Sequence, residues 1–502
     1  MAIKRYYATI DNTITNAYKS NLLTRGTGSN MGASDILEAF VIHGQTSASI
    51  NATNAEQSRV LLQFPVDKIM SDITAGIVPS SSVTYTLKMF NAPHAGTTPL
   101  SYSLDVAIAK TEWTEGRGLD MDNYSDIGAS NWGQRKVNTS WTTAGGDYYR
   151  DSDFTNVPRS GSYFFPGGVE DLSINVDFAM DRWRGGAVNN YGFLIKNSDK
   201  VISGSLGTFY TKKFFGRTSE YFLKRPYLQA EWDSSRQDDR GNFAVSSSLL
   251  TAADNINTLY LYNVVNGELK NIPYLAKNYL RVAVYSALSG AAIPGLIVDS
   301  KNNTVTYVTG GLLNEYGNDI KGIYTASFAC TGTQTVLYDV WFTGSTGPDF
   351  SSNLIQYATG SFEPKVPQTS QLIYEDKKVT AITNLESSYR QGQQPRLRIF
   401  VRNYDWNPNI YNVAVGTVKP QIIENAYYRV YRTIDNGDVI PFGTGSTNST
   451  KMSYDVSGNY FDLDTSYLDR GYTYGIQCAY KSNGQYKVQP EIFKFRISEE
   501  VS

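Results

Sequence analysis

The chain has 502 residues, with 45 Lys and Arg against 47 Asp and Glu and a formal net charge of −2. One hydrophobic core stops growing below this length, so we expect two to four domains. Because the charge is nearly balanced and no run of like charges occurs, we expect no nucleic acid partner and no strong attraction to an anionic membrane.

The composition predicts an all-β protein. Tyr occurs 37 times and Gly 42 times, and Ser, Thr and Asn are abundant. Aromatic and β-branched residues favour pleated, half-buried surfaces, and Gly, Asn and Ser favour turns. Tyr also buries a ring while its hydroxyl stays hydrated, so these residues suit either the edges of β-sandwiches or protein interfaces.

The first residues of the chain lack the apolar segment of an export signal, so we expect no signal peptide. No stretch approaches the ~18 apolar residues of a membrane span, and no lipidation motif is evident, so membrane insertion is not expected. Cys330 and Cys478 lie far apart in the sequence, and we expect two buried free thiols rather than a disulfide or a zinc site.

Period-2 alternation dominates the sequence, and helix signals are short. Two short helices are predicted, at residues 65–71 and 176–183. Strands with alternating apolar residues are predicted throughout the chain, with clear examples at residues 59–64, 83–90, 104–109, 280–285 and 396–402. In the last of these, the arginines face one side, and Leu397, Ile399 and Val401 face the other.

Two changes in composition divide the chain into three predicted domains. Residues 233–241 are polar and rich in turn residues, which is typical of a linker. Residues 360–368 contain two prolines, which interrupt strands. We therefore predict domains at residues 1–235, 242–362 and 369–502.

The second and third domains are each predicted to be a small immunoglobulin-like β-sandwich. Residues 322–328 and 336–342 have the pattern of two late strands of such a sandwich, joined by a short turn. In the third domain, residues 435–437 (Asp-Asn-Gly) separate two strand patterns, which predicts a hairpin.

The first domain contains an ordered set of motifs. They lie at residues 11–14, 30–37, 59–64, 113–116, 131–132, 140–141, 145–147, 183, 191–194 and 225–228. This set resembles the DNRLRE family, whose fold is a jelly-roll β-sandwich similar in build to carbohydrate-binding modules. The resemblance covers most of residues 5–233, with long insertions after Ile36 and around residues 144–168. It implies an N-terminal jelly roll ahead of the two smaller sandwiches.

Five of the seven tryptophans lie in this first domain, and they permit two interpretations. Large rings beside turn residues close the ends of a sandwich, which favours a role in the core. The alternative is a platform that stacks on sugar rings, with Trp113, Trp132 and Trp141 as the glycan contacts.

Carboxylates around Trp113 are the candidates for chemistry or for a metal ion. Glu112 and Glu115 flank this ring, and a glycosidase needs two carboxylates across a cleft, but the same spacing occurs on ordinary loops, so we expect no enzyme. We expect no cofactor, and the alternative is a structural calcium ion, which takes six to eight oxygen ligands. Its candidate ligands are Asp120, Asp122 and Asp126, with Asp11 and Asp35 as further candidates.

Other kinds of site lack sequence support. The two histidines, His43 and His94, lie in no recognisable motif, so neither a catalytic triad nor a zinc site is expected. Glycine pairs at residues 26–28 and 116–118 are not followed by the Lys-Ser/Thr of a phosphate-binding loop.

These patterns together favour a structural protein of a tailed bacteriophage. Strings of β-sandwiches are typical of surfaces outside cells, whereas this sequence shows neither an export signal nor a disulfide framework. Residues 427–432, 439–442 and 458–461 also loosely resemble small sandwich domains of tailed-phage structural proteins. The expected location is therefore the virion, assembled in the host cytoplasm. The expected partners are other virion proteins and copies of the chain itself. The alternative is an adhesin or receptor-binding fibre whose jelly roll holds a host surface glycan.

Overall fold

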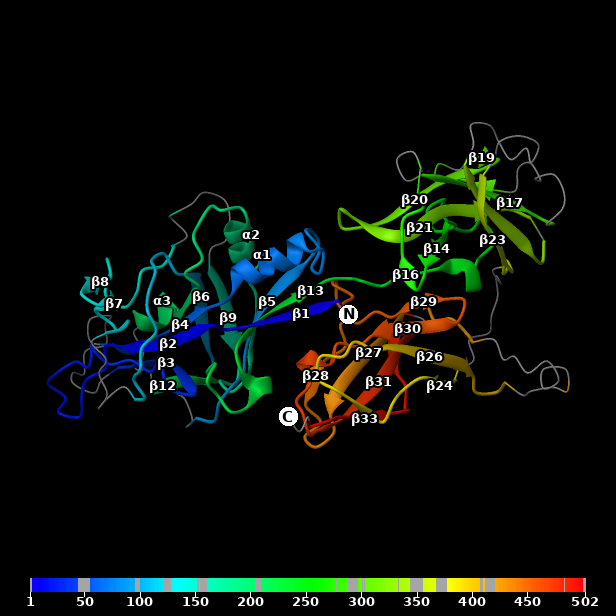
Figure 1. Ribbon diagram of the computed structural model, residues 1–502. Helices are drawn as coiled ribbons and strands as arrows, with labels where there is room; N and C mark the ends of the chain where they lie inside the picture. The colour runs from blue at the N-terminus through cyan, green and yellow to red at the C-terminus, as the bar shows by residue number, and fades with distance from the viewer. Residues whose placement is uncertain are drawn as a thin grey trace. The chain divides into compact units, whose positions relative to one another are not determined.

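The computed structural model shows a mostly β protein with several antiparallel sheets. It describes residues 2–43, 55–94, 100–120, 128–150, 153, 160–203, 209–273, 275, 279–287, 297–299, 301, 303–332, 334–343, 355–366, 377–406, 410, 420–482 and 484–499. The chain divides into two compact units, Ala2–Trp232 (the N-terminal unit) and Asp233–Ser502 (the C-terminal unit). The first unit runs from blue to green in Figure 1, and the second from green to red.

The N-terminal unit contains two large antiparallel sheets. The four-stranded sheet has the order β1 (Ile3–Tyr7), β13 (Tyr227–Glu231), β5 (Thr84–Met89) and β10 (Leu172–Asn175). The seven-stranded sheet has the order β12 (Phe209–Phe215), β3 (Ile36–Ile42), β4 (Glu56–Gln63), β11 (Phe193–Asn197), β6 (Tyr102–Ile108) and β9 (Ser160–Phe165), and β2 (Ile10–Thr15) also pairs with β4. A short ribbon of β7 (Gln134–Lys136) and β8 (Thr139–Ser140) stands apart.

Three short helices accompany these sheets. They are α1 (Val66–Thr74), α2 (Asp177–Arg184) and α3 (Asp199–Ile202). The first two confirm the helices predicted at residues 65–71 and 176–183. Buried Val66, Ile69, Met180 and Trp183 anchor α1 and α2, so their apolar faces, rather than their length, stabilise them.

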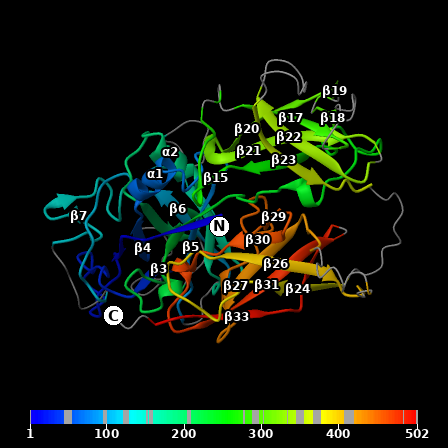
Figure 2. The same cartoon turned by 45° about the vertical axis from the view of Figure 1, so that its right-hand side comes forward.

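The first part of the C-terminal unit is one eight-stranded sheet, shown in green in Figure 2. Its order is β19 (Thr304–Val305), β18 (Ile297–Val298), β21 (Asn318–Cys330), β20 (Val308–Glu315), β17 (Leu280–Tyr285), β22 (Leu337–Thr343) and β23 (Ile355–Phe362), and β14 (Asn257–Tyr262) also pairs with β21. The two predicted late strands form as β21 and β22, but β20 and β17 lie between them in the sheet. Between β14 and β17 in the sequence, β15 (Val264–Val265) and β16 (Glu268–Leu269) form a separate two-stranded sheet.

The second part of the C-terminal unit has two sheets. One has the order β24 (Lys378–Ile382), β26 (Arg396–Asn403), β30 (Gly458–Asp462) and β29 (Ser453–Asp455). The other has the order β25 (Ser388–Tyr389), β33 (Phe493–Ile497), β31 (Thr473–Ser482), β27 (Ala426–Arg432) and β28 (Asp438–Ile440), and β32 (Gln485–Val488) pairs with β31. The rings of Tyr428 and Phe461 stack across the two sheets, with centroids 3.9 Å apart.

Two local predictions in this second part are confirmed. Leu397, Ile399 and Val401 of β26 are buried, while Arg396 on the same strand is exposed. The predicted hairpin joins β27 to β28 through Asn436, whose φ of 53° is left-handed, as turns of this kind require.

Residues 233–241, where the sequence predicts a linker, are partly or fully buried. Asp238 is 4% exposed, and it caps a 3₁₀ turn, η3 (Asp239–Gly241), by accepting a hydrogen bond from the Arg240 backbone N–H at 3.2 Å. The polar side chains here bond to protein groups on both parts of the C-terminal unit. The division at residues 242–362 and 369–502 stays a prediction.

Candidate functional site

Three of the tryptophans form an apolar cluster at one end of the N-terminal unit. Trp113, Trp132 and Trp141 are 3%, 8% and 5% exposed, and they pack with Ile14 and Leu194, among others. A stacking platform presents an open ring face to a sugar, and none of these three rings has one. The structure therefore places them in the core, which was the favoured interpretation.

The polar edges of these rings are also used inside the protein. The indole N–H of Trp113 donates to the Tyr191 carbonyl at 2.9 Å, and that of Trp141 donates to the Asn131 carbonyl at 2.8 Å. The Arg59 guanidinium lies 5.0 Å from the centre of the Trp132 ring. The two hydrogen bonds join loop residues to one another, and the Arg59 contact links a loop to β4, as expected for rings that close a sandwich.

The two carboxylates that flank Trp113 bind different cations. Glu112 forms an ion pair with Lys136, which lowers the pKa of this carboxyl. Glu115 forms a paired interaction with Arg217, with distances of 2.8 Å from Nε and 2.6 Å from Nη2. Each carboxylate is thus neutralised separately, and the pair does not form the facing acid and base of a glycosidase.

Arg217 and Glu115 surround a third carboxyl, that of Asp11 on β2. Asp11 is fully buried and accepts a hydrogen bond from the Arg217 backbone N–H at 2.7 Å, while its own N–H donates to Glu115 at 2.9 Å. Burial raises the pKa of Asp11 to about 7 despite the nearby guanidinium. A carboxyl with a raised pKa beside a second acidic side chain is a common feature of active sites, but Asp11 is closed to solvent.

The structure describes three of the five calcium candidates. Asp120 is exposed, and Asp122 and Asp126 lie outside the described residues. Of the further candidates, Asp11 is buried against Arg217 and Asp35 is exposed. Within the described part of the chain, no group of three or more His, Cys, Asp or Glu side chains could hold a metal ion.

His43 and both cysteine side chains occupy interior positions. His43 is buried, with Nε2 3.3 Å from the Ile202 carbonyl oxygen. Cys330 and Cys478 are buried free thiols, as predicted, and burial raises the pKa of each to about 12. Such thiols are poor nucleophiles at neutral pH.

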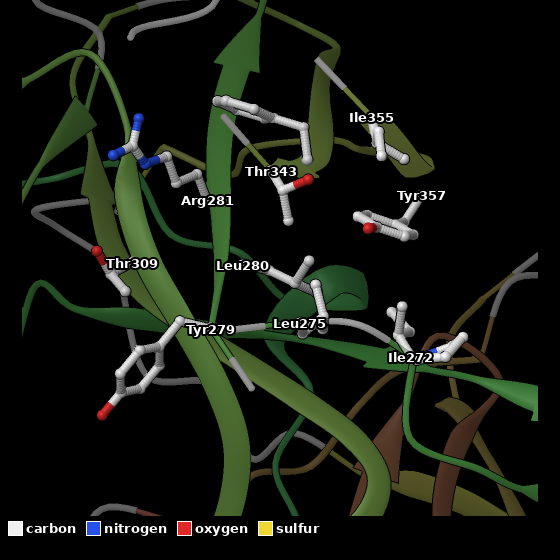
Figure 3. A pocket seen from close by; sticks show the side chains of 11 residues that line it. Ile272, Leu275, Tyr279, Leu280, Arg281, Thr309, Thr343, Ile355 and Tyr357 are labelled. Atoms are coloured by element: carbon white, nitrogen blue, oxygen red, sulfur yellow. The ribbon is translucent and has the colours of Figure 1, made fainter. Parts of the chain in front are cut away.

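A pocket of about 670 Å³ opens on the eight-stranded sheet of the C-terminal unit. Much of its lining is apolar, including Ile272, Leu275, Leu280, Phe342, Ile355 and Tyr357. In Figure 3, Leu280, Thr343 and Tyr357 surround the hollow, whereas the Arg281 guanidinium points away from Tyr357. Such a site can bury an apolar group.

No local pattern in the sequence predicts this pocket or the cluster of Asp11, Glu115 and Arg217. Asp11, Glu115 and Arg217 are more than 100 positions apart, so no local spacing connects them. The pocket residues come from four separate strands and a loop, and each alone has the appearance of an ordinary core or edge residue.

Comparisons with known proteins assign no family. No family model matches the sequence, and a search of curated proteins finds no match. Among solved structures, an amphioxus IgVJ-C2 molecule covers 48% of this chain and 96% of its own at 6% identity and a TM-score of 0.13. The chicken CNTN1 FN1-FN3 domains cover 88% of this chain and 94% of their own at 10% identity and a TM-score of 0.16. Likenesses at these TM-scores carry no argument about function.

One membrane-related property can be stated for the described residues. None of their helices combines the length and the apolar character that a membrane crossing requires.

Proposed function

We propose that this chain is a structural component of a tailed-bacteriophage virion, in the tail, neck, baseplate or capsid decoration, and that it acts through protein–protein interfaces. Rigid β-sheet units would present apolar surfaces that neighbouring copies or other virion proteins cover during assembly. Burial of apolar surface is the main driving force for such contacts.

The observation that carries the proposal is the apolar surface around the pocket of the C-terminal unit. Ile355 is 59% exposed and Tyr279 is 55% exposed, and both line the pocket. Ile355 also begins β23, which is the terminal strand of its sheet. An apolar hollow beside a sheet edge is a surface that assembling proteins commonly cover.

The phage setting comes from the sequence, and it is part of the proposal. It is supported by the ordered motifs that resemble the DNRLRE jelly roll and by the loose resemblance of residues 427–432, 439–442 and 458–461 to phage sandwich domains. The glycan-binding alternative has less support, because the three tryptophans that would stack on sugar are buried.

The test is the assembly state of the purified full-length chain and of one charge variant. Sedimentation velocity and electron microscopy of the wild type should show a symmetric oligomer or ring. Ile355→Lys should reduce the oligomer at least tenfold, because it places a charge in the apolar surface. Ile434→Lys, at a 76% exposed position between β27 and β28, is the matched control and should assemble normally.

A wild-type chain that stays monomeric at high concentration, and that binds no virion protein, would contradict the proposal. Normal assembly of Ile355→Lys would show instead that the interface lies elsewhere on the protein.

A further inference from the structure

The predicted linker of the C-terminal unit contacts both of its parts. On one side, the Arg236 backbone N–H donates to Ser453 Oγ at 2.9 Å, and the Asp238 backbone N–H donates to the Tyr454 carbonyl at 3.1 Å. Asn242 Nδ2 also donates to Glu424 at 2.7 Å. These bonds attach residues 236–242 to β29 and to the segment before β27.

The same residues bind the eight-stranded sheet. Arg236 forms an ion pair with Glu315 of β20 at 2.8 Å. Arg240 forms a paired interaction with Asp339 of β22, at 2.5 Å and 2.8 Å, and Asp339 is fully buried. Two separate strands of this sheet therefore hold the segment from the opposite side.

Asp239 joins the two parts through a single carboxyl group. Its Oδ2 accepts from the Thr258 backbone N–H on β14 at 2.7 Å, and its Oδ1 accepts from the Tyr454 hydroxyl on β29 at 2.7 Å. One carboxyl thus bonds to both parts of the C-terminal unit. Together with the ion pairs, it makes residues 236–242 a clamp rather than a linker.

We propose that this clamp is a pH-sensitive device, in which uptake of a proton by Asp238 tightens the hold of residues 236–242 on the two parts of the C-terminal unit. This inference concerns the geometry of the joint and does not rest on the virion function.

Burial and the charged surroundings of Asp238 and Asp239 together determine the direction of the pH effect. Around Asp238, the Arg240 guanidinium favours the ionised form, and Asp239 opposes it. Around Asp239, the facing groups are the Tyr454 hydroxyl of β29 and the Glu424 carboxylate. Burial is the largest influence on both, and it raises the pKa of Asp238 to about 6 and that of Asp239 above its ordinary value.

Other charged groups complete this environment. Tyr260 and Tyr262 of β14 lie close enough to interact with Asp238. Glu315 and Asp339 are each neutralised by an arginine of the clamp. The clamp arginines are thus paired with these acceptors, whereas Asp238 and Asp239 are the clamp's own carboxyls, and burial raises the pKa of both.

The direction in which pH changes the closure of the clamp follows from the pKa of Asp238 in the closed and in the opened form. In the opened clamp, Asp238 is hydrated and its pKa is near the ordinary value of about 3.9. A proton therefore binds the closed form more tightly, and closure is favoured as the pH falls from 7 towards 5. With a closed-state pKa of about 6, the opening equilibrium should be roughly tenfold smaller at pH 5 than at pH 7.

Hydrogen exchange of the full-length chain tests this. The exchange rates of the Asp238 and Thr258 backbone amides, divided by their intrinsic rates at each pH, report opening, because both amides bond within the clamp. Wild type should show the tenfold decrease between pH 7 and pH 5. Asp238→Asn should lose most of this pH effect and should open less than wild type at pH 7.

Asp233→Asn is the matched control, because this carboxylate lies in the same segment but accepts from the Ser235 N–H at 2.9 Å, outside the clamp. It should keep the tenfold effect. If Asp238→Asn fails to fold, Asp238→Ser retains a cap acceptor without a titrating group and gives the same reading. Equal opening of wild type at both pH values, or an unchanged pH effect in the Asp238 variants, would overturn the proposal.

Discussion

Asp11 anchors the local structure, but the burial of its carboxylate costs free energy when the group is ionised. It is fully buried, it anchors the Arg217 backbone, and its Oδ1 has no hydrogen-bond partner. The ion pair from Arg217 Nε is long, at 3.8 Å, because this guanidinium is directed at Glu115. Burial consequently dominates, and the ionised carboxylate is disfavoured in the folded state.

This environment predicts that acid stabilises the N-terminal unit over a limited range. The pKa of Asp11 is raised to about 7 on folding, against about 3.9 in the unfolded chain, so stability rises as the pH falls from 8 to 5. The contribution of Asp11 should be about 3 kcal/mol over this range. Urea unfolding followed by tryptophan fluorescence should show it in wild type, and Asp11→Asn should remove that part of the slope. The same slope in both proteins would contradict the prediction.

At the residue scale, the sequence predicted burial better than it predicted chemistry. Trp113 and Trp141 beside turn residues indicated rings that close a sandwich, because large apolar side chains have few other stable positions. The Asp11 cluster was not predictable, because Arg217 approaches it only after β12 pairs with β3. Chemistry that depends on distant pairing leaves no local pattern.

At the scale of the element, Gly192 allows the chain to enter β11 close to a neighbouring strand. It precedes β11 with a φ of +81°, and a Cβ at this position would lie 1.9 Å from the Leu62 carbonyl oxygen. β11 can pair with β4 in the observed register only if the chain enters this close. Glycine is therefore required for both the backbone angle and the approach.

Substitution of Gly192 should disrupt this strand entry. Gly192→Ala should destabilise the N-terminal unit by about 3 kcal/mol or more, since both strain and a backbone clash result. Gly186→Ala is the matched control, because its φ is +66° but a Cβ there meets no atom within 4 Å. It should cost about 1 kcal/mol. Similar urea midpoints for the two variants would show that the clash is relieved by local movement.

Alternation identified strands but not their neighbours. The pattern at residues 280–285 corresponds to β17, and the hairpin after β27 was predictable from its turn residues. By contrast, β1 pairs with β13 across more than 200 residues, and no local pattern contains that information. The separation of β21 from β22 in the sheet was missed for the same reason.

At the scale of the whole molecule, the ion pair of Arg240 and Asp339 connects the predicted linker to the eight-stranded sheet of the C-terminal unit. Asp339 also accepts from the Trp341 indole N–H at 2.7 Å, so the carboxylate has three donors in the interior. Removing one charge from a buried pair leaves the other without compensation. Polar sequence alone did not distinguish this buried network from a solvated linker.

Arg240→Met should therefore destabilise the C-terminal unit by about 3–5 kcal/mol. Adding Asp339→Asn to this variant should restore part of the loss, because it removes the uncompensated charge. Urea unfolding, followed by the fluorescence change of buried Trp341, measures both effects. A loss below about 1 kcal/mol for Arg240→Met would indicate that the pair behaves as a solvent-exposed one.

The two buried thiols are natural reporters of local opening in the C-terminal unit. Cys330 lies on β21 of the eight-stranded sheet, and Cys478 lies on β31 of the second part. A maleimide reagent can reach each sulfur only when the surrounding strands separate. Peptide mapping after timed labelling of the native chain would thus measure the rate at which each of the two parts opens, without an engineered probe.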